Sequence, residues 1–333
     1  MSTTIRSCAA CAARPHPAAE ALTMRPCVFI HTGRRQWLPA LVGRHSLLRA
    51  SRHADAFDVQ FLKADDHAFL RERDGQPFLQ QGERKVWRHA DAQSFSPLRF
   101  MPPQTMGYQG RAVVLDPDIF AVGDIWELLS RDMDGNAILA RPRAGTMEPG
   151  CAMITAVMLL DCARLTHWRC AADFAEAFAF RRDYATWMAL QLEPLETVGR
   201  LADEWNDLDH LSPGTKLLHN TQRRTQPWLS GLPIDFASGA NSVERRVAAS
   251  WLDRLRGRPR RDPRSTYQPH PDRRQEQLFF GLLAECLREG TITETMLREE
   301  IALAHLRPDA FALLDRAPPL PAAASLPELF RRS

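Results

Sequence analysis

Apolar and polar positions follow two different periods in the first part of the chain. The run CVFIHTG, residues 27–33, is a short apolar stretch closed by a turn signal, which is typical of a buried strand. WLPALVGRHSLLRAS, residues 37–51, repeats apolar residues at helical spacing, and FDVQFLKA, residues 57–64, predicts a second strand. Strand, helix and strand in this order predict a parallel α/β sheet with a right-handed crossover. The residues at helical spacing are Leu38, Leu41, Val42, His45 and Leu48.

A later apolar run ends in two carboxylates. RAVVLD, residues 111–116, predicts a buried strand that stops at Pro117, because proline cannot donate a ladder hydrogen bond. Residues two apart in extended backbone point the same way, so Asp116 and Asp118 can both face the space beyond the strand. Two close anions repel unless one is protonated or a cation lies between them, and hard oxygen ligands suit Mg²⁺ or Mn²⁺. The alternative is a solvated turn in which aspartates simply favour the bend.

The order of these elements adds a candidate nucleotide loop. In parallel α/β sheets, ligands bind beyond the carboxyl ends of the strands. HTGRRQ, residues 31–36, follows the first predicted strand, so His31 and Thr32 are candidate nucleotide-binding residues. After the aspartates, Asp124 and Glu127 have the spacing of a capping box that opens a helix over IWELLSR, residues 125–131.

The composition indicates a globular protein. Its 333 residues are 44% hydrophobic, and its formal charge of +3 is too mild to predict nucleic-acid binding by itself. No apolar run approaches the roughly 18 to 20 residues of a membrane span, so we expect a soluble, cytoplasmic protein. The seven cysteines are scattered and form no disulfide framework, and the CxxC of Cys8 and Cys11 lacks further zinc ligands nearby.

The two ends of the chain differ from its middle. The first residues show no periodicity and predict a disordered leader, with Met24 as an alternative start. Residues 243–274 are densely basic, and EQLFFGLLAECLREG then predicts an amphipathic helix that stops at Gly290. The basic stretch can dock on the inner face of an anionic membrane or on a phosphorylated acceptor, or it is merely solvated. The expected divisions are a leader at 1–25, a main domain at 26–240, a basic helical region at 241–317 and a Pro/Ala-rich loose tail at 318–333.

Several segments together carry a family resemblance. GYQGRAVVLDPDIFAVGDIWELL, residues 107–129, resembles the DxD segment of GT-A fold glycosyltransferases, in particular the family 8 type that includes glycogenin-like and lipopolysaccharide sugar transferases. FSPLRF has Arg99 where that family has a basic residue that contacts the nucleotide. ITAVMLLDCARLTHW, residues 154–168, resembles the acceptor-side strand and helix, and LLHNTQRRTQPW, residues 217–228, resembles the late strand whose histidine completes the metal site. The resemblance implies a Rossmann-like nucleotide-binding sheet flanked by helices, here with a helical C-terminal extension.

The resemblance also implies a reaction and its residues. A GT-A-like enzyme would move a sugar from a nucleotide-diphosphate donor, by family implication a UDP-sugar, to a glycan, lipid or protein acceptor with retention of configuration. Asp118 would be the main carboxylate ligand of Mn²⁺ (or Mg²⁺), Asp116 would reach the metal and the donor ribose, and His219 would be the third protein ligand. The ion would bridge the diphosphate and stabilise charge on the departing phosphate.

The sequence departs from the family pattern in two places. Family members have a lysine before the Pro-Trp pair that helps hold the diphosphate, whereas this chain has Gln226. Arg223 or Arg224 would supply the missing charge, since guanidinium pairs well with phosphate oxygens, or both are solvated loop residues. The family's Asp-Gln pair near the reacting sugar aligns only with Asp183 and Tyr184. Asp183 is therefore the candidate catalytic stabiliser near the anomeric carbon, and a surface helix acid is the alternative.

Two other classes of protein fit parts of the sequence. A haloacid-dehalogenase-type phosphatase also places DxD after an apolar strand and uses the first aspartate as its nucleophile. That fold would want the motif on its first core strand, and it gives His219 no role. A non-catalytic nucleic-acid or partner-binding protein would use residues 243–274 and would not need the aspartates or the histidine. The transferase reading predicts no nucleic-acid partner.

Overall fold

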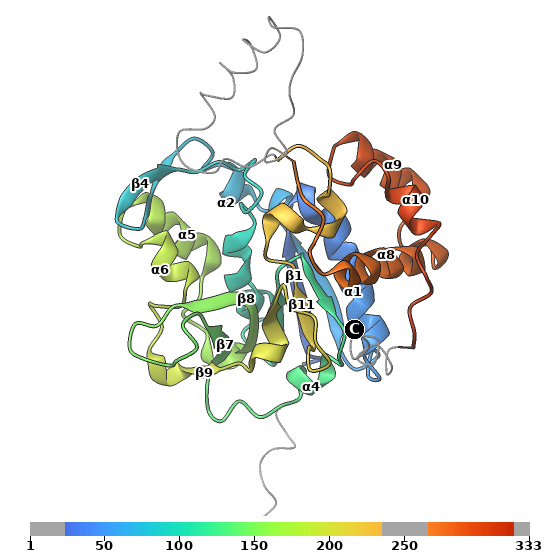
Figure 1. Ribbon diagram of the computed structural model, residues 1–333. Coiled ribbons are helices and arrows are strands. Elements are labelled where there is room, and N and C mark those ends of the chain that lie inside the picture. Colours follow the sequence, from blue (N-terminus) through green and yellow to red (C-terminus); the bar gives the residue numbers. More distant parts are fainter. Residues whose placement is uncertain (1–23, 235–265, 323–333) are drawn as a thin grey trace, which may run out of the picture.

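The computed structural model describes residues 24–234 and 266–322 (Figure 1). The predicted leader lies outside these residues except for its last two positions, and so does the CxxC of Cys8 and Cys11. Most of the basic run at 243–274 lies outside them as well. Within the two described ranges, none of the helices has the length and apolar character needed to cross a membrane.

A mixed six-stranded sheet forms the centre of the fold. Its strands are β1 (Cys27–Thr32), β2 (Asp58–Lys63), β5 (Arg111–Leu115), β7 (Ile138–Pro142), β8 (Met153–Asp161) and β9 (Val198–Arg200), in the order β2-β1-β5-β8-β7-β9. β1 pairs in parallel with β2 and β5, whereas β8 runs antiparallel to β5 and β7. The helix α1 (Trp37–Ala50) connects β1 to β2. The predicted α/β class is therefore confirmed, and β1 lies where the connections diverge to either side, which is where such sheets bind ligands.

A second sheet of three short strands follows directly from β5. Its strands are β6 (Ile119–Ala121), β10 (Asp207–Leu208) and β11 (Leu217–His219), in the order β10-β11-β6. Only Asp116, Pro117 and Asp118 separate β5 from β6. β11 runs antiparallel to β6 and pairs His219 with Ile119. The predicted late strand is confirmed, and its pairing brings the histidine to the aspartate turn.

The helix α1 lies closely against β6. A Cβ atom at Gly43 would lie 2.9 Å from the Ile119 carbonyl oxygen, so this close approach requires glycine. One turn later, the Ser46 hydroxyl accepts a hydrogen bond from the Ala121 N–H at 2.8 Å. Because α1 is covered by β6 on one side and by a C-terminal helix on another, its buried face is broader than the apolar spacing predicts. The buried residues are Leu38, Pro39, Ala40, Val42, Gly43, His45, Ser46 and Leu47, whereas the expected Leu41 and Leu48 are half-buried.

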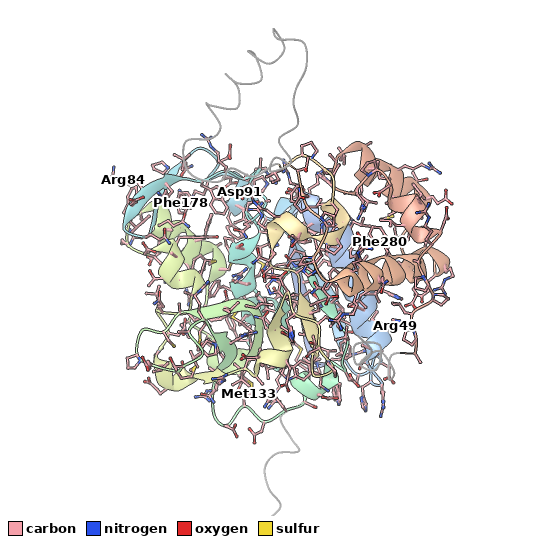
Figure 2. All side chains as sticks on the ribbon, viewed as in Figure 1. Arg49, Arg84, Asp91, Met133, Phe178 and Phe280 are labelled. Atoms are coloured by element: carbon pink, nitrogen blue, oxygen red, sulfur yellow. The ribbon has the colours of Figure 1, made fainter. Side chains whose placement is uncertain are left out.

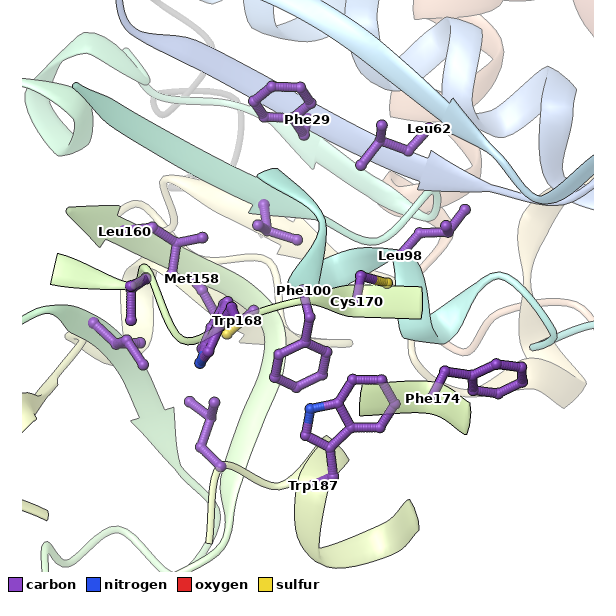
Figure 3. Packing of buried hydrophobic residues seen from close by; sticks show 14 of the residues in the cluster. Phe29, Leu62, Leu98, Phe100, Met158, Leu160, Trp168, Cys170, Phe174 and Trp187 are labelled. Carbon is purple, nitrogen blue, oxygen red and sulfur yellow. The ribbon is translucent and has the colours of Figure 1, made fainter. Parts of the chain in front are cut away.

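An aromatic core fills the other side of the central sheet. Phe100 stacks on Trp187 with ring centroids 4.5 Å apart and contacts Trp168 at 4.8 Å (Figure 3). This packing holds the 3₁₀ turn Ser96–Phe100, and with it Arg99, against the sheet. The surrounding elements are α2 (Ala68–Arg71), the hairpin β3 (Pro77–Gln80) and β4 (Glu83–Val86), α3 (Pro102–Thr105), α5 (Cys170–Phe178) and α6 (Tyr184–Met188). The helix expected directly after β8 is only a 3₁₀ turn (Cys162–Arg164), and α5 begins later.

Helices from the end of the chain pack beside α1, at the right of Figure 1. They are α8 (Arg273–Arg288), α9 (Glu294–Ala302) and α10 (Ala310–Leu314). Phe279 of α8 contacts Phe120 of β6 with ring centroids 5.5 Å apart and Trp228 at 5.0 Å. The predicted helix stop is confirmed, since Gly290 has a φ of +74°. α8 therefore supports the strand that follows Asp118.

A buried ion cluster ties α8 to α1. Glu285 of α8 accepts hydrogen bonds from Arg49 and contacts His45 at 3.0 Å. Arg49, labelled in Figure 2, also donates to the Pro321 carbonyl oxygen at 2.6 Å. Leu320 packs against Gly281 of α8. The expected loose tail is thus held by these contacts as far as the structure describes it.

The predicted capping box does not form. The helix α4 (Trp126–Leu129) is short, and Asp124 accepts hydrogen bonds from the Trp126 and Arg52 N–H groups, both at 3.0 Å. Glu127 pairs with Lys216 at 2.7 Å instead of reaching back to the start of the helix. An ion pair between α4 and the residue before β11 has replaced the reciprocal half of the motif.

Candidate metal and nucleotide site

Asp116, Asp118 and His219 form a compact cluster. One carboxylate or imidazole atom of each lies within 4.8 Å of the others. The turn between β5 and β6 supplies the two carboxylates, and the end of β11 supplies the imidazole. The turn residues point the same way because they are two apart, as the sequence predicts, and the β6–β11 pairing adds the third group.

His219 is held in an orientation suited to binding a cation. It is 5% exposed, and its Nδ1 lies 2.8 Å from Oδ1 of Asn206, a side chain that can accept the ring proton there. Its Nε2 then faces Asp118 Oδ1 at 3.4 Å. Burial would lower the pKa of His219, but the charge and hydrogen bond of Asp118, together with the charges of Asp116 and Asp209, outweigh it and raise the pKa above its ordinary value. A hydrogen-bonded Nδ1 is the usual way to aim Nε2 at a metal.

Asp116 is fixed through one of its two oxygens. Its Oδ1 lies 2.8 Å from His31 Nε2 and accepts a hydrogen bond from Arg99 Nη2 at 2.9 Å. Burial would raise the pKa of Asp116, but the charge of Arg99, together with His31, holds it well below its usual range. Burial in turn lowers the pKa of His31, so this histidine is a neutral donor to Asp116. Asp116 is therefore ionised, with Oδ2 left for a ligand.

Asp118 is fixed from the opposite side. Its Oδ2 accepts a hydrogen bond from Gln226 Nε2 at 2.9 Å, and its Oδ1 faces the histidine. Asp118 is only 8% exposed. Asp118 Oδ1, a carboxylate oxygen of Asp116 and the imidazole Nε2 thus form a set of two oxygens and one nitrogen, which fits Mn²⁺ or Mg²⁺.

The cluster lines a cavity of about 690 Å³. Arg99 and Thr155 share this wall and are hydrogen-bonded to each other at 2.6 Å. Asp91, labelled in Figure 2, is an exposed carboxylate of the lining. The remaining charged residues that line the cavity are Lys85, Arg88, Arg143 and Arg223. Basic side chains from four separate segments therefore line the same cavity as the carboxylates of Asp116 and Asp118.

The other predicted residues lie in different places. Thr32 is buried and donates its hydroxyl proton to the Gly33 carbonyl oxygen, and it does not line the cavity. His31 lies behind Asp116 and acts through it. Arg223 lines the cavity, whereas Arg224 does not.

Asp183 caps a helix. Its Oδ1 accepts hydrogen bonds from the Ala185 and Thr186 N–H groups at the start of α6, and its Oδ2 accepts one from the Gly82 N–H in the β3–β4 turn. Partial burial would raise the pKa of Asp183, but the N–H donation from Gly82 and Thr186 lowers it. The carboxylate is occupied by backbone groups and does not line the cavity. This placement favours the structural alternative for Asp183.

Sequence reasoning missed Asn206 and the basic cavity residues. Asn206 lies in a 3₁₀ turn before β10, where asparagine is ordinary turn chemistry, so no local signal marks its contact with His219. Lys85 and Arg88 come from the hairpin side of the cavity, and Arg143 follows β7. Arg143 is far in the sequence from Lys85 and Arg88, and only the tertiary fold brings them to one cavity.

Comparison with known proteins gives distant structural likenesses. No protein-family model and no curated protein matches the sequence. The glycosyltransferase GlyE of Streptococcus pneumoniae TIGR4 is 14% identical with a TM-score of 0.43, and the match covers 71% of this chain and 65% of GlyE. The galactosyltransferase LgtC is 11% identical with a TM-score of 0.42, covering 70% of this chain and 98% of LgtC. This chain thus spans just under two thirds of GlyE. Because these likenesses are remote, the functional proposal rests on the geometry of the site.

Proposed function

We propose that this protein is a divalent-cation-dependent glycosyltransferase that moves a sugar from a UDP-sugar to an acceptor and retains the anomeric configuration. The observation that carries the proposal is the cluster of Asp116, Asp118 and His219 on the wall of a cavity of about 690 Å³. A cavity of this size suits a small-molecule ligand. The choice of UDP and the retention follow from the family that the sequence resembles.

The chain's own residues have separate tasks in this proposal. Asp118, Asp116 and His219 would hold the cation, and Arg99 and His31 keep Asp116 ionised. When bound, the ion supplies charge stabilisation for the departing diphosphate. Basic side chains of the lining, with Arg223 foremost because it follows the histidine strand, add to that stabilisation through charge-assisted hydrogen bonds.

The cavity offers few alternatives for covalent chemistry. Among the described residues, the carboxylates that line it are Asp91, Asp116 and Asp118. Asp116 and Asp118 belong to the candidate metal cluster, and Asp183 accepts hydrogen bonds at the start of α6. A mechanism in which the acceptor attacks on the face that the diphosphate leaves needs no protein nucleophile. The glycan, lipid or protein acceptor would fill the part of the cavity toward the β3–β4 hairpin.

A phosphatase function accounts less well for the arrangement of the cluster. Asp116 would have to attack phosphorus, yet its Oδ1 is bound by His31 and Arg99, and its lowered pKa makes it a weak nucleophile. The motif also follows two earlier strands of the sheet. His219 at the cluster is expected for a transferase and has no role in a phosphatase.

Calorimetric titration with UDP tests the proposal. The wild type should bind UDP with Mn²⁺ and much more weakly without it, and Asp118→Ala should abolish the metal-dependent part. Asp315→Ala is the matched control, because it removes an exposed acid at the end of α10, and it should bind UDP as the wild type does. Preference for GDP or ADP over UDP would refute the carrier. No nucleoside diphosphate binding with either Mn²⁺ or Mg²⁺ would refute the function.

A further inference from the structure

A row of three buried amide side chains lies behind the metal cluster. Gln226, Asn220 and Gln275 are 2%, 1% and 1% exposed. Gln226 Nε2 donates to Asp118 Oδ2 at 2.9 Å and to the Asn220 carbonyl oxygen at 3.1 Å. Asn220 Nδ2 donates to Gln275 Oε1, and Gln275 Nε2 donates to the Asp209 carbonyl oxygen at 2.8 Å. The row therefore runs from a carboxylate of the cluster to the first turn of α8.

Burying such a row of amides costs free energy. A buried amide costs free energy unless every polar atom is paired, and apolar side chains of similar shape often serve stability as well or better. Here the Asn220 Oδ1 atom has no hydrogen-bond partner among the described residues, so the row is not even fully satisfied. What apolar side chains cannot supply is an N–H donor to the inner oxygen of Asp118. The arrangement therefore points to the carboxylate as the reason for the row.

We propose that Gln226 is a positioning residue for Asp118 and is itself held by the row that reaches α8. Both partners of Gln226 Nε2 are oxygens that only accept, so the amide must turn its nitrogen toward them. The hydrogen bond occupies Asp118 Oδ2 and leaves Oδ1 directed at His219. The chain thus uses a neutral donor, aimed at a metal ligand, where the family resemblance led us to expect a cation for the diphosphate. This inference rests on the proposed function, because it concerns the same cluster.

The test measures Mn²⁺ binding directly, with and without UDP, by calorimetry and by the electron paramagnetic resonance of the bound ion. Gln226→Met keeps the volume and removes the donor, and Gln226→Asn keeps an amide on a side chain too short to reach Asp118. Both should lower Mn²⁺ affinity about tenfold, the scale at which outer-sphere partners act. Gln275→Met should lower it by a smaller factor, because Gln275 acts through Asn220.

Controls separate positioning from general loss of structure. Gln277 is exposed on the same helix as Gln275, and Gln191 is an exposed amide bonded to the Gly150 carbonyl oxygen, so Gln277→Met and Gln191→Met should bind Mn²⁺ as the wild type does. Metal-free thermal midpoints identify any variant that is merely unfolded. Wild-type Mn²⁺ affinity in a folded Gln226→Met or Gln226→Asn protein would overturn the inference while leaving the proposed function intact. Failure of the wild type to bind either Mn²⁺ or Mg²⁺, with or without UDP, would overturn both.

Discussion

Replacing Glu285 with glutamine should destabilise the protein in a pH-dependent way. Glu285 is the acceptor that joins α8 to Arg49 and His45 of α1, and its side chain is 11% exposed against 13% for Arg49. Exposed ion pairs contribute up to about 1 kcal/mol, whereas breaking a buried one costs roughly 3–5 kcal/mol. Glutamine retains one acceptor oxygen and the shape of the side chain. We therefore expect Glu285→Gln to lose about 2 kcal/mol of unfolding free energy at pH 7.

The sign of the pH dependence follows from the carboxyl group. Burial would raise the pKa of Glu285, but the hydrogen bonds from Arg49 and His45 outweigh it, and the folded-state pKa lies below the ordinary value of 4.5. A group with a depressed folded pKa stabilises the fold above its unfolded pKa, and this contribution is lost as pH falls through the folded pKa. The difference between wild type and Glu285→Gln should therefore be full at pH 6–7 and shrink below about pH 4.

Urea unfolding at a series of pH values measures this difference. Glu294→Gln is the control, because Glu294 forms an exposed pair with Arg298 on α9 and should change stability by less than about 0.5 kcal/mol. An equal difference between wild type and Glu285→Gln at pH 7 and pH 3.5 would show that the charge of Glu285 is not what holds α8 to α1. Equal effects of the two glutamine variants at pH 7 would lead to the same conclusion.

Three further substitutions probe the support of the site. Asn206→Leu removes the acceptor at His219 Nδ1 and should weaken Mn²⁺ binding about tenfold in a calorimetric titration, with wild-type affinity counting against the orienting role. Phe279→Ala should cost about 3–5 kcal/mol in urea unfolding, since the ring is fully buried against aromatic neighbours, and a loss below about 1 kcal/mol would contradict this packing. Arg99→Met leaves Asp116 with one donor, so UDP affinity in the presence of Mn²⁺ should fall at least fivefold, and unchanged affinity would exclude Arg99 from the site.

The sequence predicted the elements whose signals are local. Proline at position 117 ends β5 where the pattern predicted, and Gly290 ends α8 because that backbone position is left-handed. The antiparallel half of the central sheet was not predicted, since strand direction is set by chain connections and leaves no mark on an apolar run. The capping box failed for a similar reason: Glu127 had a distant lysine available, and spacing alone cannot reveal that competitor.

The same division holds within the site. Two aspartates on one face of extended backbone follow from residue geometry, so Asp116 and Asp118 were predictable from spacing, while His219 came from the resemblance. Gln226 stands where the family has a lysine for the diphosphate, but the structure places its amide against Asp118. The role of an amide depends on which polar atoms the fold brings within 3 Å, and the sequence around Gln226 says nothing of an aspartate that precedes it by 108 residues.

The contact between α1 and α8 has a consequence for how the chain is made. Glu285 follows Arg49 by 236 residues, and synthesis at about 5–20 residues per second separates them by roughly 10–50 s. During that interval, Leu38 and Val42 of α1 and Phe120 of β6 lack the helix that covers them. The aspartate turn is synthesised before Gln275, which lies behind it through Gln226 and Asn220. The support of the turn is therefore complete only after α8 has been made, and a growing chain presents an apolar surface to chaperones until then.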